Sequence, residues 1–180
     1  MRLGLSGPLH LILLLALALC VPGVPADTAA DHRLGPGDKV RIAVFGEDDL
    51  SVAERVSDRG TIAYPLLGEL RVDNLTTDEL AQMIDSRLRG PYLVDPRVTV
   101  SIEEYREFFV MGQVKRPGGY AYLPGLTIRK AVSIAGGYTE RASRNKLFMI
   151  LEGEPDKERR ADQDDPVRPG DTIVVKESLF

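Results

Sequence analysis

Residues 112–138 read GQVKRPGGYAYLPGLTIRKAVSIAGGY, and this stretch predicts a tight turn, a strand and a helix in succession. Its segment 116–119 is typical of a turn, because proline fixes φ and glycine accepts a positive φ. Thr127 stands where a helix N-cap belongs. The apolar residues after it have the spacing of one helical face: Ile128, Ala131, Val132 and Ala135. Gly136 and Gly137 then end the predicted helix, because a glycine can adopt the left-handed conformation there.

Strands are predicted on both sides of this stretch. Residues 108–111 form an apolar run typical of a buried strand, and residues 120–122 alternate tyrosine with alanine. Residues 145–151 predict another strand, whereas residues 152–166 are charged and predict a solvated loop. Residues 167–175 predict a last strand that begins with a Pro-Gly-Asp turn. The second half of the chain is therefore predicted to combine strands with one helix.

The first half of the chain predicts a similar mixture. Residues 77–89 predict a helix, because Thr76 and Glu79 have capping-box spacing and apolar residues line one face. The predicted strands cover 39–45, 54–56, 61–64 and 98–102. The Pro-Gly-Asp turn at residues 36–38 is repeated at residues 169–171, which indicates shared turn chemistry without establishing a repeat architecture. The fold class is predicted to be α+β.

Composition places the chain among globular proteins and excludes one class of partner. Its 180 residues are 43% hydrophobic and 28% charged, which is typical of one or two small folded domains. The formal net charge is −4, and charges of both signs are mixed along the chain. Because no basic block is present to neutralise phosphates, nucleic acid is excluded as a main partner.

Residues 1–26 are predicted to be a signal peptide. Arg2 supplies a positive charge, residues 9–21 form an apolar segment too short to span a membrane, and cleavage is expected after Ala26. A second interpretation is lipidation of Cys20, although Leu19 occupies a position where a lipidation signal has a small residue. An uncleaved anchor is a third interpretation. Cleavage after Ala26 would remove the single cysteine, so no disulfide is expected.

The sequence predicts no enzyme and no metal or cofactor site. After cleavage, His32 is the single histidine, and we expect it in a leader outside the first domain. The chain has no phosphate-binding glycine loop, and the acidic residues 47–49 lack calcium-loop spacing. Paired carboxylates for glycoside hydrolysis stay open as an alternative, because 27 Asp and Glu residues offer many pairs. Without tryptophan, six tyrosines are the remaining aromatic platforms for a sugar: Tyr64, Tyr92, Tyr105, Tyr120, Tyr122 and Tyr138.

Two ordered patterns resemble known domains. The pattern G-x-V-x-x-P-G-x-Y followed by T-I-x-x-A-V-x-x-A-G-G-Y, within residues 112–138, resembles the soluble-ligand-binding β-grasp (SLBB) module. The pattern L-G-P-G-D-x-V-x-I-x-V-F from residue 34, with S-D-R-G-T-I-x-Y-P-L-L-G, L-T-x-x-E-L and D-P-R-V-T-V-S-I after it, resembles the polysaccharide biosynthesis/export domain. The resemblance implies an export domain at about 33–105 and a β-grasp domain at about 106–180.

The resemblance also supplies candidate ligand-binding residues, which are positions of the two signatures. For each glycine, the alternative is a role in turn or cap geometry alone. The candidates are Gly35, Pro36, Gly37, Asp38, Gly112, Pro117, Gly118, Tyr120, Gly136 and Gly137.

The function that the resemblance implies is export of a capsule polysaccharide, exopolysaccharide or biofilm polymer. The protein is expected in the periplasm, associated with the outer membrane, as a conduit or adaptor that assembles into a homo-oligomeric ring. Because the sequence ends at Phe180, we expect the short form of the family, which lacks the C-terminal pore helix of long members. The implied partners are therefore the polysaccharide, an inner-membrane co-polymerase and a separate outer-membrane pore of the β-barrel type. The alternatives are a stand-alone periplasmic module that binds a glycan or small ligand, and a glycan-modifying enzyme.

Overall fold

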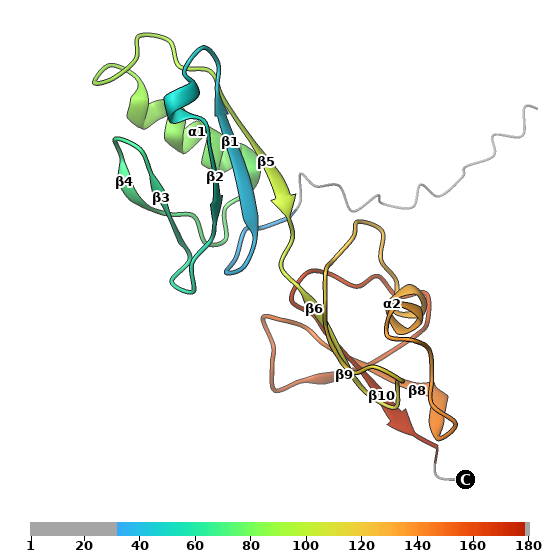
Figure 1. Ribbon diagram of the computed structural model, residues 1–180. Helices are drawn as coiled ribbons and strands as arrows, with labels where there is room; N and C mark the ends of the chain where they lie inside the picture. Colours follow the sequence, from blue (N-terminus) through green and yellow to red (C-terminus); the bar gives the residue numbers. More distant parts are fainter. Residues whose placement is uncertain (1–31, 179–180) are drawn as a thin grey trace, which may run out of the picture.

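The computed structural model describes residues 32–178 and contains two units that follow each other along the chain (Figure 1). Each unit has its own sheet, one α-helix and its own cluster of buried apolar side chains. The two clusters share no residue, and the chain passes from one unit to the other between Glu104 and Phe108. The predicted α+β fold class is confirmed.

The first unit has a three-stranded antiparallel sheet with the order β2-β1-β5. A separate hairpin, β3-β4, and helix α1 complete the unit, and α1 packs against β5. In β1, residues Val40, Ile42 and Val44 are buried, as alternation predicts for a strand with one buried face. The elements are β1 (Lys39–Val44), the short 3₁₀ helix η2 (Asp48–Leu50), β2 (Val52–Arg55), β3 (Thr61–Tyr64), β4 (Gly68–Arg71), α1 (Thr77–Leu88) and β5 (Val98–Glu104).

Helix α1 forms as its sequence predicts. The Thr76 hydroxyl accepts a hydrogen bond from the Glu79 amide, and the Glu79 carboxylate accepts one from the Thr76 amide at 2.8 Å. Together they form the predicted capping box, which satisfies two amides that have no partner within the helix. Leu80, Ile84 and Leu88 are buried, which confirms the predicted inner face.

The second unit has a five-stranded sheet with the order β7-β6-β10-β8-β9. Strands β6 and β10 run parallel at its centre, and the other neighbouring pairs are antiparallel. Helix α2 lies beside the sheet (Figure 1). The elements are β6 (Phe108–Gly112), β7 (Gly118–Tyr120), α2 (Ile128–Ile134), β8 (Ala142–Ile150), β9 (Glu158–Ala161) and β10 (Thr172–Glu177).

Helix α2 confirms the predicted start and end. The Thr127 side chain accepts from the Lys130 amide at 3.5 Å, and the apolar face of the helix is buried. Gly136 and Gly137 follow the helix with φ values of +84° and +87°, so two consecutive residues take the left-handed conformation. The Gly137 amide donates to the carbonyl of Val132 at 2.9 Å, which satisfies a carbonyl of the last turn.

Four predictions about strands are corrected by the structure. The strand predicted at 120–122 is β7 and covers Gly118–Tyr120. Residues 152–166 are not a loop throughout, because β9 forms within them and pairs with β8. Three of its four residues are exposed, so no apolar alternation marks this edge strand. The strand predicted at 54–56 is β2 and begins at Val52, and the strand predicted at 145–151 is β8 and begins at Ala142. Strand β4 was not predicted.

Candidate functional site

A buried carboxylate anchors the junction between the two units. Asp38, in the turn before β1, is fully buried. Its Oδ1 accepts the Arg106 amide at 2.7 Å, and its Oδ2 accepts the Gly35 amide at 3.0 Å, Arg106 Nη1 at 2.6 Å and His32 Nε2 at 2.8 Å. Asp38 therefore joins the turn before β1 to the segment that connects β5 with β6.

The charges around Asp38 and Arg106 keep both groups ionised. Burial is the largest influence on Asp38 and opposes ionisation, but the hydrogen bonds from His32 and Arg106 and the charge of Arg106 outweigh it and lower the pKa. Burial likewise opposes the charge of Arg106, but hydrogen bonding to Glu152 and the charge of Asp38 raise the pKa of the guanidinium. The pair is therefore a buried ion pair.

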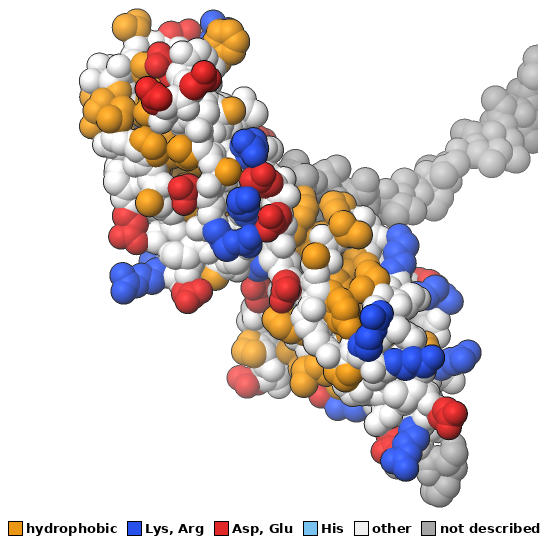
Figure 2. All heavy atoms as spheres, viewed as in Figure 1, with side chains coloured by type: hydrophobic (Ala, Val, Ile, Leu, Met, Phe, Trp, Pro, Cys, Tyr) orange, Lys and Arg blue, Asp and Glu red, His pale blue; other side chains and the backbone are white. Residues whose placement is uncertain are grey.

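Arg106 extends this network into the second unit. Its Nε donates to Glu152 Oε1 at 2.9 Å, and its Nη2 donates to Glu152 Oε2 at 2.6 Å, a two-pronged arrangement. The Glu152 amide in turn approaches Asp171 Oδ1 at 3.4 Å. A chain of polar contacts thus runs from the Pro-Gly-Asp turn of the first unit to that of the second. Figure 2 shows charged side chains of both signs gathered where the units meet.

The two Pro-Gly-Asp turns have the same internal hydrogen bonds. The Asp38 amide donates to the Gly35 carbonyl, and the Asp171 amide donates to the Arg168 carbonyl, both at 3.2 Å. Each carboxylate also accepts the amide three residues before it, at 3.0 Å in the first turn and 2.9 Å in the second. The turns differ in their surroundings, because burial is the largest influence on Asp171 and raises its pKa despite the amide hydrogen bonds.

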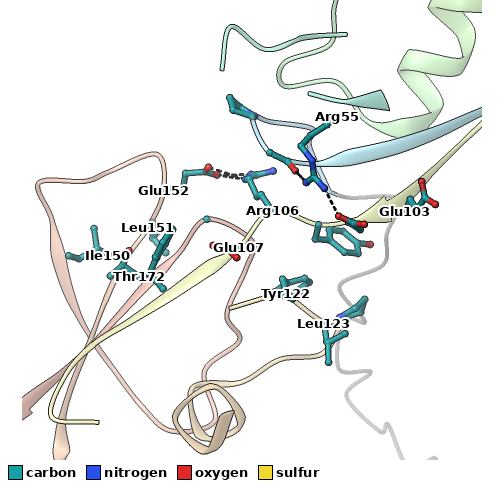
Figure 3. A pocket seen from close by; sticks show the side chains of 18 of the residues that line it. Arg55, Glu103, Arg106, Glu107, Tyr122, Leu123, Ile150, Leu151, Glu152 and Thr172 are labelled. Carbon is teal, nitrogen blue, oxygen red and sulfur yellow. Dashed lines mark hydrogen bonds and ion pairs between the residues drawn. The ribbon is translucent and has the colours of Figure 1, made fainter. Parts of the chain in front are cut away.

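A cleft of about 1010 Å³ opens beside this network, with side chains of both units on its walls (Figure 3). Arg55 lies on the wall from the first unit, where it donates to the Gly37 carbonyl at 2.6 Å and pairs with Glu104. The wall from the second unit includes the loop after β7, where Leu123 is 63% exposed. The floor includes Phe109, Ile150 and Thr172, which are neighbours across β6, β10 and β8.

An aromatic group borders the cleft. Tyr105 packs edge-to-face against His32 at 5.0 Å and against Tyr122 at 5.2 Å between ring centroids. Both tyrosines line the cleft, and Phe109 adds an exposed ring. Pockets that combine apolar surface with a few fixed polar groups are typical ligand sites. The arrangement can hold a polyhydroxylated or amphipathic ligand by packing and hydrogen bonding.

The candidate residues of the first signature lie at this site. Pro36 and Gly37 line the cleft, and Asp38 anchors the network behind it. Gly35 contacts the Arg106 guanidinium, since a Cβ there would stand 3.2 Å from its Cζ. Gly37 has φ +95°, and a Cβ there would stand 3.2 Å from Arg106 Cβ. The structure thus brings these four residues together.

The candidate residues of the second signature lie elsewhere, and none of them lines the cleft. Gly112 ends β6 and packs against the backbone of β10. The turn between β6 and β7 lies against the end of α2, because the Arg116 amide donates to Ala135 and the Lys115 amide to Gly137. Pro117 lies in this turn, Gly118 and Tyr120 are the two ends of β7, and Gly136 and Gly137 follow α2. The described contacts of Pro117, Gly136 and Gly137 are those of turn and cap geometry, whereas Tyr120 pairs with Phe108 in the sheet and packs against its ring.

Sequence reasoning missed the main polar residues of the site and misplaced one. Arg106, Glu107 and Glu152 were not identified, because no local pattern marks them. His32 was expected in a leader outside the first domain, but its ring contacts Asp38 and Tyr105 and its side chain is 11% exposed. That prediction was wrong, because the buried carboxylate six residues ahead holds the ring. Cys20 and the predicted cleavage site lie outside the described residues.

Two further searches cover residues 32–178. No group of three or more His, Cys, Asp or Glu side chains in this range could hold a metal ion. No helix of the described chain has the length and apolar character needed to cross a membrane. One buried side-chain atom in the same range lacks a hydrogen-bond partner, the Tyr138 hydroxyl, which lies beyond the cleft.

Comparisons with known proteins agree with the two units. Residues 26–103 match the family model of the polysaccharide biosynthesis/export protein, and residues 108–156 match that of the SLBB domain. The chain is 32% identical to the exopolysaccharide production protein ExoF of Rhizobium meliloti over 148 residues, 76% of this chain and 35% of the relative. It is 25% identical to the polysialic acid transport protein KpsD of Escherichia coli over 166 residues, 88% of this chain and 27% of the relative.

The chain thus spans about a third of the length of these relatives, or less. The two family models occur in it one after the other, and the order is that of the two patterns in the sequence. The chain therefore belongs to the polysaccharide biosynthesis/export protein family and carries an SLBB domain after its export domain.

Proposed function

We propose that this protein is a non-enzymatic component of a polysaccharide export system, in which it guides the polymer as a conduit or adaptor. The observation that carries the proposal is the succession of an export domain and an SLBB domain with an open cleft between them. The domain limits we propose are 33–105 and 106–180. The printed names of the relatives, an exopolysaccharide production protein and a polysialic acid transport protein, support a polysaccharide as the polymer but no particular class of sugar.

The chemistry of the cleft favours binding over catalysis. Glu104 forms an ion pair with Arg55, and Glu152 forms one with Arg106, so both carboxylates already have a cationic partner within the protein. Carboxylates bound to arginines in this way are not free to transfer a proton to a sugar. Weak contacts spread over a cleft suit a polymer that must move on, because tight binding would stall it.

The proposed location and partners follow from this role. Residues 1–26 would direct export to the periplasm, with lipidation of Cys20 as the alternative, and the protein would associate with the outer membrane. The proposed partners are the polysaccharide, an inner-membrane co-polymerase, an outer-membrane pore and further copies of this chain in a ring.

Deletion of the gene tests the proposed function. Surface and periplasmic polysaccharide are measured separately in the deletion strain and in the same strain carrying the gene on a plasmid. We expect surface polymer to fall and periplasmic polymer to accumulate, with recovery on complementation. Unchanged surface polymer, in a strain with no second copy of the gene, would contradict the proposal.

The cleft itself favours a second candidate function, a stand-alone periplasmic module that holds a free glycan or small ligand. The same deletion strain distinguishes the two. A stand-alone module predicts normal surface polymer together with loss of ligand uptake or retention, whereas an export component predicts the redistribution of polymer described above.

A further inference from the structure

The floor of the cleft places an aromatic ring beside a carboxylate. Phe109 on β6 is paired with Gly119 on β7, and the missing side chain of Gly119 leaves room above the strand. A Cβ on Gly119 would stand 2.5 Å from Glu107 Oε2 and 3.0 Å from Phe109 Cε1. The carboxylate and the ring therefore lie together over Gly119, and both line the cleft.

Gly119 allows this arrangement because it has no side chain, and no special backbone conformation is involved. Gly119 does not have a positive φ, so its backbone conformation is open to residues other than glycine. An alanine at this position would displace the side chains of Glu107 and Phe109, because atoms do not approach a Cβ as closely as 2.5 Å. The glycine is thus a positioning residue for the two groups that lie over it.

The charges that line the cleft are unequal. Four glutamates and two arginines line it: Glu103, Glu104, Glu107, Glu152, Arg55 and Arg106. Both arginines are already engaged, Arg55 with Glu104 and Arg106 with Asp38 and Glu152. Glu107 is exposed and has no side-chain hydrogen bond or ion pair within residues 32–178. The cleft therefore offers a carboxylate acceptor, whereas its cations are occupied by carboxylates of the protein.

We propose that this cleft binds an uncharged segment of a glycan and disfavours sugars that carry a carboxylate. The Phe109 ring packs against the C–H face of a sugar, and Glu107 accepts hydrogen bonds from its hydroxyl groups, which a carboxylate accepts strongly. Leu123 and Ile150 add apolar surface to the lining of the cleft. The inference rests on the proposed function and adds the class of sugar that the site selects.

An acidic sugar in the same position would meet Glu107 without gaining a cation. Releasing Arg106 for it would leave the buried Asp38 with fewer partners and Glu152 without its arginine, which costs free energy, and Arg55 is already bound to Glu104 and the Gly37 carbonyl. Repulsion between two exposed carboxylates a few ångströms apart corresponds to about tenfold weaker binding at low salt. Salt screens such repulsion, so the difference between neutral and acidic sugars is expected to shrink as ionic strength rises.

Binding to the purified protein tests the proposal. The probes are hexamers of glucose, galactose and mannose and the corresponding uronic acid hexamers, titrated while amide chemical shifts are followed. We expect at least one neutral hexamer to bind, with shifts at the cleft, and its uronic acid counterpart to bind about tenfold more weakly at low salt. Binding of no neutral hexamer, or tighter binding of the uronic acids, would overturn the proposal.

Matched variants separate the two parts of the site. Glu107→Gln is expected to bring the affinity for the uronic acid hexamer close to the affinity for the neutral hexamer. Glu47→Gln, on an exposed glutamate of the first unit, is expected to leave the ratio of the two affinities unchanged. Phe109→Ser is expected to weaken the neutral hexamer about tenfold, and Phe45→Ser, on a ring that is 74% exposed, leaves its affinity unchanged. Circular dichroism checks that each variant is folded.

Gly119→Ala supplies an independent test, because it keeps both binding groups and displaces them. This variant is expected to weaken binding of the neutral hexamer about as much as Phe109→Ser does. An unchanged ratio in Glu107→Gln, or an unchanged affinity in both Phe109→Ser and Gly119→Ala, would overturn the assignment. These outcomes are independent of the export measurement. A protein that exports polymer without binding it at this cleft would pass the deletion test and fail the binding test.

Discussion

At the scale of single residues, Asp38 and Asp171 show how surroundings set the behaviour of a carboxylate. Both occupy the same place in a Pro-Gly-Asp turn, and both accept the amide three residues before them. The pKa of Asp38 is lowered, since His32 and Arg106 outweigh the effect of burial, whereas burial raises the pKa of Asp171. The two carboxylates should therefore change stability with pH in opposite directions.

The pH dependence of two asparagine variants tests this difference. Asp38 stabilises the fold above its ordinary pKa of 3.8, and that stabilisation is lost as pH falls through the lower folded pKa. Asp38→Asn is therefore expected to lower the free energy of unfolding by about 3 kcal/mol at neutral pH and by less near pH 3. Asp171 has a folded pKa above 3.8, so its contribution is lost as pH rises, and Asp171→Asn should cost less at neutral pH than near pH 3. Urea unfolding across this range measures both, and parallel pH trends for the two variants would contradict the assignment.

At the scale of elements, a close backbone approach holds β6 to β10. Gly112 ends β6 with φ +84°, and a Cβ there would stand 2.2 Å from the Val175 carbonyl oxygen. That oxygen accepts the Gln113 amide at 2.9 Å, so it cannot move away without losing a hydrogen bond of the sheet. Gly112 was a candidate ligand residue, and its described contacts indicate a structural role.

Substitution of Gly112 by alanine tests that role against a matched glycine. Gly68 also has a positive φ, +72°, but a Cβ there meets nothing within 4 Å. Gly68→Ala should cost the conformational strain alone, about 1 kcal/mol, because alanine disfavours this backbone conformation. Gly112→Ala should cost about 3 kcal/mol, since the close contact adds to the same strain. Chemical denaturation measures the free energy of unfolding of both variants. Equal losses would show that the close contact with Val175 does not contribute to the cost.

The elements also show what local sequence can predict. Helices α1 and α2 were predicted because caps and apolar spacing lie within a dozen residues, and the Gly136-Gly137 end follows from backbone sterics. Strand β9 was missed because its side chains are mostly charged and its pairing with β8 depends on main-chain groups. The position of His32 depends on Asp38 and Tyr105, of which Tyr105 is far away in the sequence.

At the scale of the whole molecule, the site depends on contacts that no local pattern contains. Arg106 lies 68 residues from Asp38 and 46 residues from Glu152, and it contacts both. The order of the two domains followed from their signatures, but the cleft between them is formed by these distant partners. The six candidate residues of the second signature do not line the cleft. A family signature includes residues that fix turn geometry as well as residues that bind a ligand.

Replacement of Arg106 tests whether this network fixes the two units relative to each other. The buried clusters of the units share no residue, so their orientation depends on the junction between Glu104 and Phe108. The Arg106 side chain is 14% exposed and contacts Asp38 and Glu152, whereas that of Arg129 is 59% exposed and pairs with Asp164 inside the second unit. Arg106→Met should leave Asp38 buried with fewer partners and lower the free energy of unfolding by about 3 kcal/mol. Arg129→Met should change it by less than about 1 kcal/mol.

The orientation of the units is the second readout of the same variants. Residual dipolar couplings of the two units should fit one alignment tensor in the unmodified protein and in Arg129→Met. In Arg106→Met they should require two tensors, because the main-chain link through the Arg106 amide and Asp38 is all that the network retains. Arg106→Lys should fall between the two, since lysine keeps the charge but cannot reach Asp38 and Glu152 with a planar fork. A single tensor together with unchanged stability in Arg106→Met would show that the peptide connection alone sets the orientation, and that the cleft does not depend on the ion pairs beside it.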